Sequence, residues 1–374
     1  MGDNKKKFQS ALKVQQGIEQ PSSVNPSLTD TLKGQKKIFF TLDEYVEGIL
    51  KSNRTILSKA ITLIESSLHE HQQLAQQIIA RCLPYAGNSI RIGITGVPGV
   101  GKSTFIEALG KHLCNTGHKL AVLAIDPSSE RSKGSILGDK TRMEELSVDA
   151  NAFIRPSPSA GSLGGVARKT RETIVLCEAA GFDTIFVETV GVGQSETAVH
   201  AMVDFFLLLM LANAGDELQG IKRGIMEMAD AIAINKADGE NKKMATLAMS
   251  QYKNALHLFP PTDSGWIPEV ACCSAYTREG IDNLWNIISD YQVFTKGNNY
   301  FNVKRQQQAK RIMLETVNDN IKDNFYNNKA VAAMIPKLQQ AILDDKISSY
   351  VAAQQLLDVY FKDKKTEADD SCIS

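Results

Sequence analysis

The clearest chemical pattern in this sequence is a glycine-rich run that ends in Lys102 and Ser103. The run reads Gly-Val-Pro-Gly-Val-Gly-Lys-Ser and has the spacing G-x-x-x-x-G-K-[ST] of a phosphate-binding loop. Its glycines let successive backbone N–H groups turn toward phosphate oxygens, and the N-terminus of a following helix also attracts anions. We expect Lys102 to contact the β- and γ-phosphates and the Ser103 hydroxyl to ligate Mg²⁺. The predicted nucleotide-binding residues here are Gly96, Val97, Pro98, Gly99, Val100, Gly101, Lys102, Ser103 and Thr104.

A second pattern indicates which base the nucleotide carries. The run Asn-Lys-Ala-Asp that begins at Asn235 has N-K-x-D spacing, and its Asp238 carboxylate can accept two hydrogen bonds from guanine N1–H and N2–H₂, donors that adenine lacks. We expect the Lys236 stem to lie across the base and Asn235 to join this loop to the phosphate loop. Ser274 and Ala275 follow the last predicted strand and fit a second base-contacting loop, with the Ala275 N–H directed at guanine O6. The sequence therefore predicts binding of GTP and GDP rather than ATP.

Two carboxylates at strand ends are candidates for the metal site. Asp126 follows one predicted strand, and Glu188 follows another and begins a Glu-Thr-Val-Gly run that ends at Gly191. GTPases usually have D-x-x-G here, with the carboxylate directing Mg²⁺ and the glycine N–H sensing the γ-phosphate. We expect the longer Glu188 side chain to reach Mg²⁺ through water, because Mg²⁺ gives up its water reluctantly. The alternative for either carboxylate is a plain strand-end charge or helix cap.

The elements that position these residues alternate along the chain. Short β-branched or apolar runs are separated by helix-length amphipathic segments, which predicts a mostly parallel, doubly wound sheet covered by helices, an α/β P-loop NTPase fold. The predicted strands are 92–95, 120–125, 184–187, 205–211, 231–234 and 270–272.

The same patterns divide the chain into five predicted parts. Residues 1–37 are polar and are interpreted as a flexible tail, and helical periodicity over 38–86 predicts an N-terminal helical arm. Residues 87–294 form the predicted GTPase domain. Apolar residues at three- and four-residue steps predict helices over 295–365, which we expect to form a homodimer, followed by a tail at 366–374.

Composition excludes several other functions. The chain has 374 residues with 42 Lys+Arg and 42 Asp+Glu, and this balance argues against a broad basic surface for nucleic acid or anionic lipid. The longest apolar run, residues 205–212, is far shorter than the roughly 20 residues needed to cross a bilayer. Six cysteines without C-x-x-C spacing indicate reduced thiols. We therefore expect a cytoplasmic protein with no nucleic-acid or membrane partner.

Four longer runs carry a resemblance to a known family. Residues 126–129, 134–143, 188–196 and 215–224 are similar to the corresponding runs of the MeaB/ArgK family of GTPases, and the likeness covers roughly residues 40–360. The resemblance implies a G domain of the signal-recognition type. It also implies a chaperone of an adenosylcobalamin-dependent methylmalonyl-CoA mutase, which uses GTP to gate cofactor loading and to protect or rescue the mutase. Adenosylcobalamin would then be met only through the partner.

The resemblance also assigns roles to individual residues. Asp126, Asp139 and Glu188 would organise the metal and the attacking water, together with Lys102 and Ser103 at the phosphates. The segment around Asp139 would be a first switch and the segment after Glu188 a second. A third, family-specific switch would couple nucleotide state to the partner through Asp216, Glu217, Gln219 and Lys222.

Two other functions fit parts of the sequence. A nucleotide-dependent kinase linked to amino-acid transport, as the ArgK name implies, would need an acceptor pocket with a base, and no motif for one is present. A GTPase that matures a metal centre would need a His-rich tract or a Cys/His ligand cluster, which this chain lacks.

Overall fold

The computed structural model describes residues 40–125, 143–156, 163–189, 195–212 and 223–371. The described residues from Leu42 onward belong to one compact unit.

Within these residues, seven strands form one sheet in the order β3-β2-β4-β1-β5-β6-β7, and every pairing is parallel. Its central strands are buried on both faces, which is why they read as continuous apolar runs in the sequence. The expected α/β fold is confirmed. The strands are β1 (Ile90–Gly96), β2 (Leu120–Ile125), β3 (Ala152–Pro156), β4 (Thr184–Thr189), β5 (Phe205–Leu211), β6 (Ala231–Asn235) and β7 (Glu269–Cys272).

Strand β3 was not predicted from the sequence. This strand is short, lies at the edge of the sheet, and ends at Pro156. Proline lacks the N–H that a central strand needs and is confined to edges and strand ends. Its presence made the segment resemble a loop.

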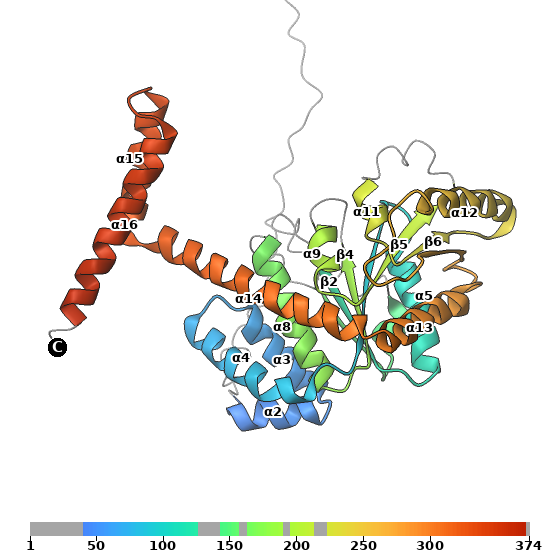
Figure 1. Ribbon diagram of the computed structural model, residues 1–374. Helices are drawn as coiled ribbons and strands as arrows, with labels where there is room; N and C mark the ends of the chain where they lie inside the picture. Colours follow the sequence, from blue (N-terminus) through green and yellow to red (C-terminus); the bar gives the residue numbers. More distant parts are fainter. Residues whose placement is uncertain (1–39, 126–142, 157–162, 190–194, 213–222, 372–374) are drawn as a thin grey trace, which may run out of the picture. The chain divides into compact units, whose positions relative to one another are not determined.

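Helices cover both faces of the sheet (Figure 1). α5 (Lys102–Asn115) and α13 (Ile281–Gly297) pack together on one face, and α8 (Leu163–Ala179) and α9 (Ser195–His200) pack on the other. α12 (Lys242–Leu256) packs on β6 and β7. Short helices complete this part of the chain: α7 (Glu144–Ser147), α11 (Arg223–Glu227) and the 3₁₀ turn η3 (Gly239–Asn241).

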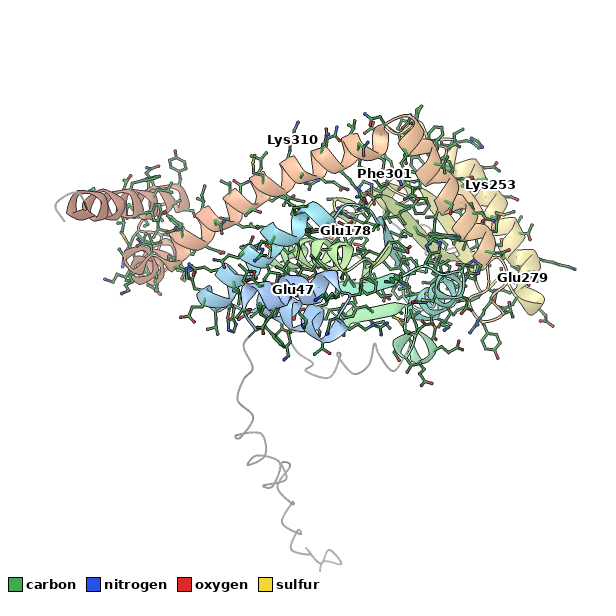
Figure 2. The ribbon with its side chains drawn as sticks, turned by 90° about the horizontal axis from the view of Figure 1, so that it is seen from below. Glu47, Glu178, Lys253, Glu279, Phe301 and Lys310 are labelled. Carbon is green, nitrogen blue, oxygen red and sulfur yellow. The ribbon has the colours of Figure 1, made fainter. Side chains whose placement is uncertain are left out.

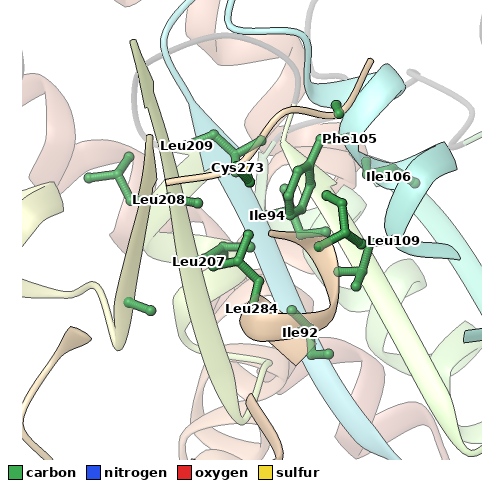
Figure 3. Packing of buried hydrophobic residues seen from close by; sticks show 14 of the residues in the cluster. Ile92, Ile94, Phe105, Ile106, Leu109, Leu207, Leu208, Leu209, Cys273 and Leu284 are labelled. Carbon is green, nitrogen blue, oxygen red and sulfur yellow. The ribbon is translucent and has the colours of Figure 1, made fainter. Parts of the chain in front are cut away.

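The core between β1, β5, α5 and α13 fixes the start of α5 (Figure 3). Phe105 and Leu109 of α5 pack with side chains of β1 and β5, and all of them are buried. Burying each such side chain contributes about 1.5–3 kcal/mol relative to leaving it exposed. The loop between β1 and α5 is therefore held at both ends by packed elements.

The predicted N-terminal arm contains three helices, α2 (Leu42–Leu50), α3 (Arg54–Glu65) and α4 (His69–Cys82), followed by the 3₁₀ turn η1 (Leu83–Tyr85). Asn53 caps α3, because its side-chain oxygen accepts hydrogen bonds from the N–H groups of Thr55 and Ile56. All three helices pack against α8.

The chain ends in α14 (Tyr300–Asn327), α15 (Lys329–Leu343) and α16 (Ser349–Ser371), and α15 packs against α16. No helix among the described residues is long and apolar enough to cross a membrane.

A buried group of charges joins α14 to the end of the sheet that lies opposite the phosphate loop; Figure 2 labels Glu178 and Phe301 in this region. The Arg305 guanidinium donates to both carboxylate oxygens of Asp204, at 2.8 and 2.7 Å. Arg91 donates to both oxygens of Glu178, at 2.8 and 2.9 Å. Burial alone would raise the pKa of Glu178, but the hydrogen bonds and charge of Arg91 hold it below its ordinary value. We name Arg91, Glu178, Asp204 and Arg305 the anchor cluster.

Candidate nucleotide site

The phosphate loop lies where an open α/β sheet binds ligands. It leaves the carboxyl end of β1, which is flanked by β4 and β5 in the middle of the sheet, and it enters the N-terminus of α5. Gly101 has φ of +86° at the start of that helix, a conformation that favours glycine. A Cβ on Gly96 would lie 2.5 Å from the backbone oxygen of Leu209, so a side chain does not fit there.

Lys102, Ser103 and Thr104 occupy the first turn of α5. The Lys102 Nζ donates to the Gly96 carbonyl at 2.9 Å, so the side chain curls back over the loop. The pKa of Lys102 lies below its ordinary value, because burial lowers it more than the carboxylates of Glu188 and Glu196 raise it. An ammonium group placed over this loop can exchange its carbonyl partner for a phosphate oxygen.

Asn235 joins the base loop to the phosphate loop. It ends β6 and is 1% exposed, and its Nδ2 donates to the Val100 carbonyl at 2.8 Å. The next residue, Lys236, has φ of +58°, and its Nζ donates to the Gly99 carbonyl at 2.8 Å. The structure thus brings together two segments about 135 residues apart in the sequence.

The second predicted base loop lies against the first. The Ser274 hydroxyl donates to the Asp238 carboxylate and accepts from the Thr277 N–H at 3.1 Å. The Ala275 N–H, which we expect to be directed at guanine O6 in the nucleotide complex, donates to Asn235 Oδ1 at 3.0 Å. Buried N–H groups are almost always paired, and this oxygen is the acceptor within reach.

Glu188 lies at the same edge of the sheet. It is the fifth residue of β4, where it pairs with Ile94 of β1 and Ala124 of β2, and it is buried. Glu196, fully buried in the first turn of α9, also acts on Lys102 and was not predicted. The signal that could have found it is an acidic residue in the helix that follows the Glu-Thr-Val-Gly run.

Ser103 and Glu188 are the predicted metal ligands that the structure describes. Their oxygen donors suit Mg²⁺, which keeps several waters and needs few protein ligands. No group of three or more His, Cys, Asp or Glu residues in the described part of the chain could hold a metal ion.

The remaining predicted residues lie outside the described residues: Asp126, Asp139, Gly191, Asp216, Glu217, Gln219 and Lys222. The strands that precede their segments are β2, β4 and β5, which run parallel to β1 and end at the edge where the phosphate loop begins.

The model of the family described as methylmalonyl Co-A mutase-associated GTPase MeaB matches residues 57–330. A protein of Escherichia coli named GTPase ArgK is 43% identical over 316 residues, which are 84% of this chain and 96% of that protein. A mouse protein named methylmalonic aciduria type A homolog, mitochondrial, is 43% identical over 356 residues, 92% of this chain and 86% of that protein. A crystal structure named LAO/AO transport system kinase superposes with a TM-score of 0.68 at 38% identity, covering 85% of this chain and 97% of that one.

Proposed function

Because this chain belongs to the MeaB family of methylmalonyl-CoA mutase-associated GTPases, we propose that it hydrolyses GTP at the site described above and acts as a chaperone of an adenosylcobalamin-dependent methylmalonyl-CoA mutase. In this role GTP gates cofactor loading, protection and reactivation of the mutase. The chain itself carries GTP or GDP with Mg²⁺, and adenosylcobalamin is handled only through the partner.

The observation that carries the nucleotide assignment is the placement of Asn235. Its buried side-chain amide donates a hydrogen bond to the Val100 carbonyl in the phosphate loop and accepts one from the Ala275 N–H in the second base loop. A nucleotide bound by its phosphates then has its base beside Asp238, whose carboxylate is already oriented by the Ser274 hydroxyl. A carboxylate there pairs with guanine and is left unpaired by adenine, which is the costly case.

We propose catalytic roles for the residues that the motifs and the family resemblance predict. Lys102 would bind the β- and γ-phosphates, while Ser103, Glu188, Asp126 and Asp139 would hold Mg²⁺ and its waters. When bound, Mg²⁺ neutralises charge that develops on the phosphates. The charge of Glu188 opposes the lowering of the Lys102 pKa by burial.

Titration calorimetry with Mg²⁺ tests base selection. We expect GTP and GDP to bind and ATP to bind far more weakly, and Asp238→Asn to weaken GTP by ~10- to 100-fold, since a charge-assisted hydrogen bond contributes roughly 1.5–3 kcal/mol. Asp358→Asn, in α16, is the matched control and should change nothing. Equal affinities of the wild-type protein for ATP and GTP would refute the assignment.

The partner is tested by affinity purification from the native organism, which should bring down a cobalamin-dependent mutase. Lys222→Ala should leave GTP affinity unchanged and reduce the mutase's stimulation of GTP hydrolysis. This expectation follows from a segment, 214–224, that combines three glycines with charges able to exchange partners. Unchanged stimulation would remove Lys222 from the coupling role.

We further propose a homodimer through the C-terminal helices. Large apolar side chains on α14, α15 and α16 are exposed in the single chain, as unpartnered contact faces are. They include Met313, Leu314, Val317, Ile321, Leu343, Tyr350, Leu357 and Phe361. Light scattering should show a dimer that Val317→Glu with Ile321→Glu converts to a monomer. Deleting 297–374 is not a suitable test, because it removes Arg305 from the anchor cluster.

We propose the cytoplasm as the compartment. The five cysteines in the described part of the chain are free thiols, which suits a reducing environment. The mouse relative's name places that protein in mitochondria.

A further inference from the structure

The second base loop carries an aromatic residue, Tyr276. This side chain is 88% exposed, and no other large apolar or aromatic side chain in the described part of the chain is more exposed. It directly follows Ser274 and Ala275 of the second base loop, and both of these residues are buried. An aromatic ring is thus held in solvent beside the predicted base position.

The exposure does not come from a loosely held loop. The Ser274 N–H donates to the Glu279 carbonyl at 2.9 Å, and the Thr277 N–H closes a turn onto the Ser274 hydroxyl. Arg278 Nη2 donates to both carboxylate oxygens of Glu145 in α7, at 2.9 and 2.8 Å. The Glu279 carboxylate, labelled in Figure 2, pairs with Lys242 of α12 at 2.8 Å.

Glycine at the end of the loop also restricts its position. Gly280 has φ of +76°, and a Cβ there would lie 2.5 Å from the Cys272 carbonyl oxygen. Both ends of the loop are therefore fixed against β7, and Tyr276 lies at the apex of the turn between them.

The other members of the predicted base site supply little apolar surface for the two faces of a base. Asn235, Asp238, Ser274 and Ala275 offer hydrogen-bonding groups and a methyl group, and Lys236 offers only its aliphatic stem. A purine has two flat faces, and an aromatic side chain is the group that covers such a face best. Stacking does not depend on the base's edge groups, because every base has a π face.

We propose that the Tyr276 ring stacks on the face of the bound guanine base and sets the affinity for the nucleotide without setting the choice between guanine and adenine. Edge recognition belongs to Asp238, and Tyr276 supplies the surface on which the base rests. The proposal rests on the proposed guanine nucleotide site and adds to it a residue that determines affinity.

The test compares GTP, GDP and ribose 5′-triphosphate, which has the phosphates and the sugar but no base. Tyr276→Ala should weaken GTP and GDP alike, by about 5- to 150-fold, the range that stacking of one base on an aromatic ring corresponds to. It should leave the affinity for ribose 5′-triphosphate unchanged. Tyr276→Phe keeps the ring and should bind GTP as the wild type does. Tyr85→Ala removes a ring that is 55% exposed in η1, outside the nucleotide site and the proposed dimer face, and serves as the control.

Two results would overturn the stacking role. One is unchanged GTP affinity in Tyr276→Ala, and the other is an equal loss for GTP and ribose 5′-triphosphate, which would mean that the variant distorts the phosphate site. Asp238→Asn, measured in parallel, separates this proposal from the one on which it rests. If Asp238→Asn weakens GTP and Tyr276→Ala does not, stacking alone fails; if Asp238→Asn has no effect, the guanine site itself fails.

Discussion

Asp230 is buried and His200 is half-buried near α14, and the two groups are expected to give the protein's stability opposite dependences on pH. Burial raises the pKa of the Asp230 carboxyl to about 6; Lys304 and a hydrogen bond from the Phe206 N–H lower it, and Asp204 raises it further. Burial lowers the pKa of the His200 imidazole to about 4, and Lys304 and Arg311 of α14 lower it further. Both groups favour the neutral form in the folded protein.

The magnitudes follow from the shifts. The pKa of Asp230 lies about 2 above its ordinary value. Above pH 6 the carboxyl is ionised in both the folded and the unfolded state, and its burial then costs about 3 kcal/mol of stability. This cost disappears as the pH falls to 4. The pKa of His200 lies about 2.5 below its ordinary value. Stability is therefore lost as the pH falls from about 6.5 to 4, because the imidazole of the unfolded chain takes up a proton first. From pH 5 to 8, Asp230 lowers the free energy of unfolding by about 1.4 kcal/mol and His200 raises it by about 2 kcal/mol. They largely cancel in the wild type.

Single substitutions should uncover each effect. Urea unfolding followed by tryptophan fluorescence at pH 5, 6, 7 and 8, at constant ionic strength, gives the free energy of unfolding for each variant. Relative to wild type, Asp230→Asn should gain about 1.4 kcal/mol from pH 5 to 8, and His200→Asn should lose about 2 kcal/mol over the same range. Asp358→Asn, on α16, should run parallel to wild type. Parallel profiles for Asp230→Asn or His200→Asn would refute the reasoning for that group.

Three further predictions concern the phosphate loop, the anchor cluster and the reaction rate. Gly96→Ala should destabilise the protein by ~2–3 kcal/mol in urea unfolding, because the new Cβ would meet a backbone oxygen. Gly99→Ala places its Cβ where no atom lies within 4 Å and should cost only about 1 kcal/mol of backbone strain. Equal costs for the two variants would contradict this. Arg305→Ala should cost ~3–5 kcal/mol, since it leaves the buried Asp204 charge without its guanidinium, and a cost under about 1 kcal/mol would show that the cluster is not holding α14. Steady-state GTP hydrolysis by the isolated protein should be slow, ~10⁻⁴ to 10⁻² s⁻¹. The reason is that the residue two positions after Gly191 is not a glutamine, which would orient the attacking water. A rate above about 1 s⁻¹ would contradict this prediction.

The parts of the fold that sequence predicted are those with local signals. Short apolar or β-branched runs marked six of the seven described strands. β3 was missed because Pro156 and its edge position give it a loop's composition. The glycine pattern and the N-K-x-D spacing located both loops of the site, since each motif is contiguous. The hydrogen bond between Ala275 and Asn235 could not be foreseen, because it depends on how two strand ends approach each other.

Charges that meet only in the folded chain were also missed. Nothing in the sequence around Asp204 or Glu178 marks them as partners of arginines elsewhere, because Asp204 and Arg305 are 101 residues apart and Glu178 and Arg91 are 87 apart. Glu196 reaches Lys102 through the fold in the same way. Tertiary pairing of this kind has no short-range signature.

The distance in sequence between Asp204 and Arg305 has a consequence for how the protein is made. At roughly 5–20 residues per second, a ribosome needs on the order of 5–20 s to add the 101 residues that separate them. When that interval begins, the growing chain contains the phosphate loop but not yet the base loops, which are added during it. Throughout the interval the Asp204 carboxylate lacks its guanidinium and favours water over burial. Closing the sheet around Asp204 before α14 has been synthesised is costly, so nascent chains that stop short of residue 305 are expected to be the forms that chaperones and proteases meet.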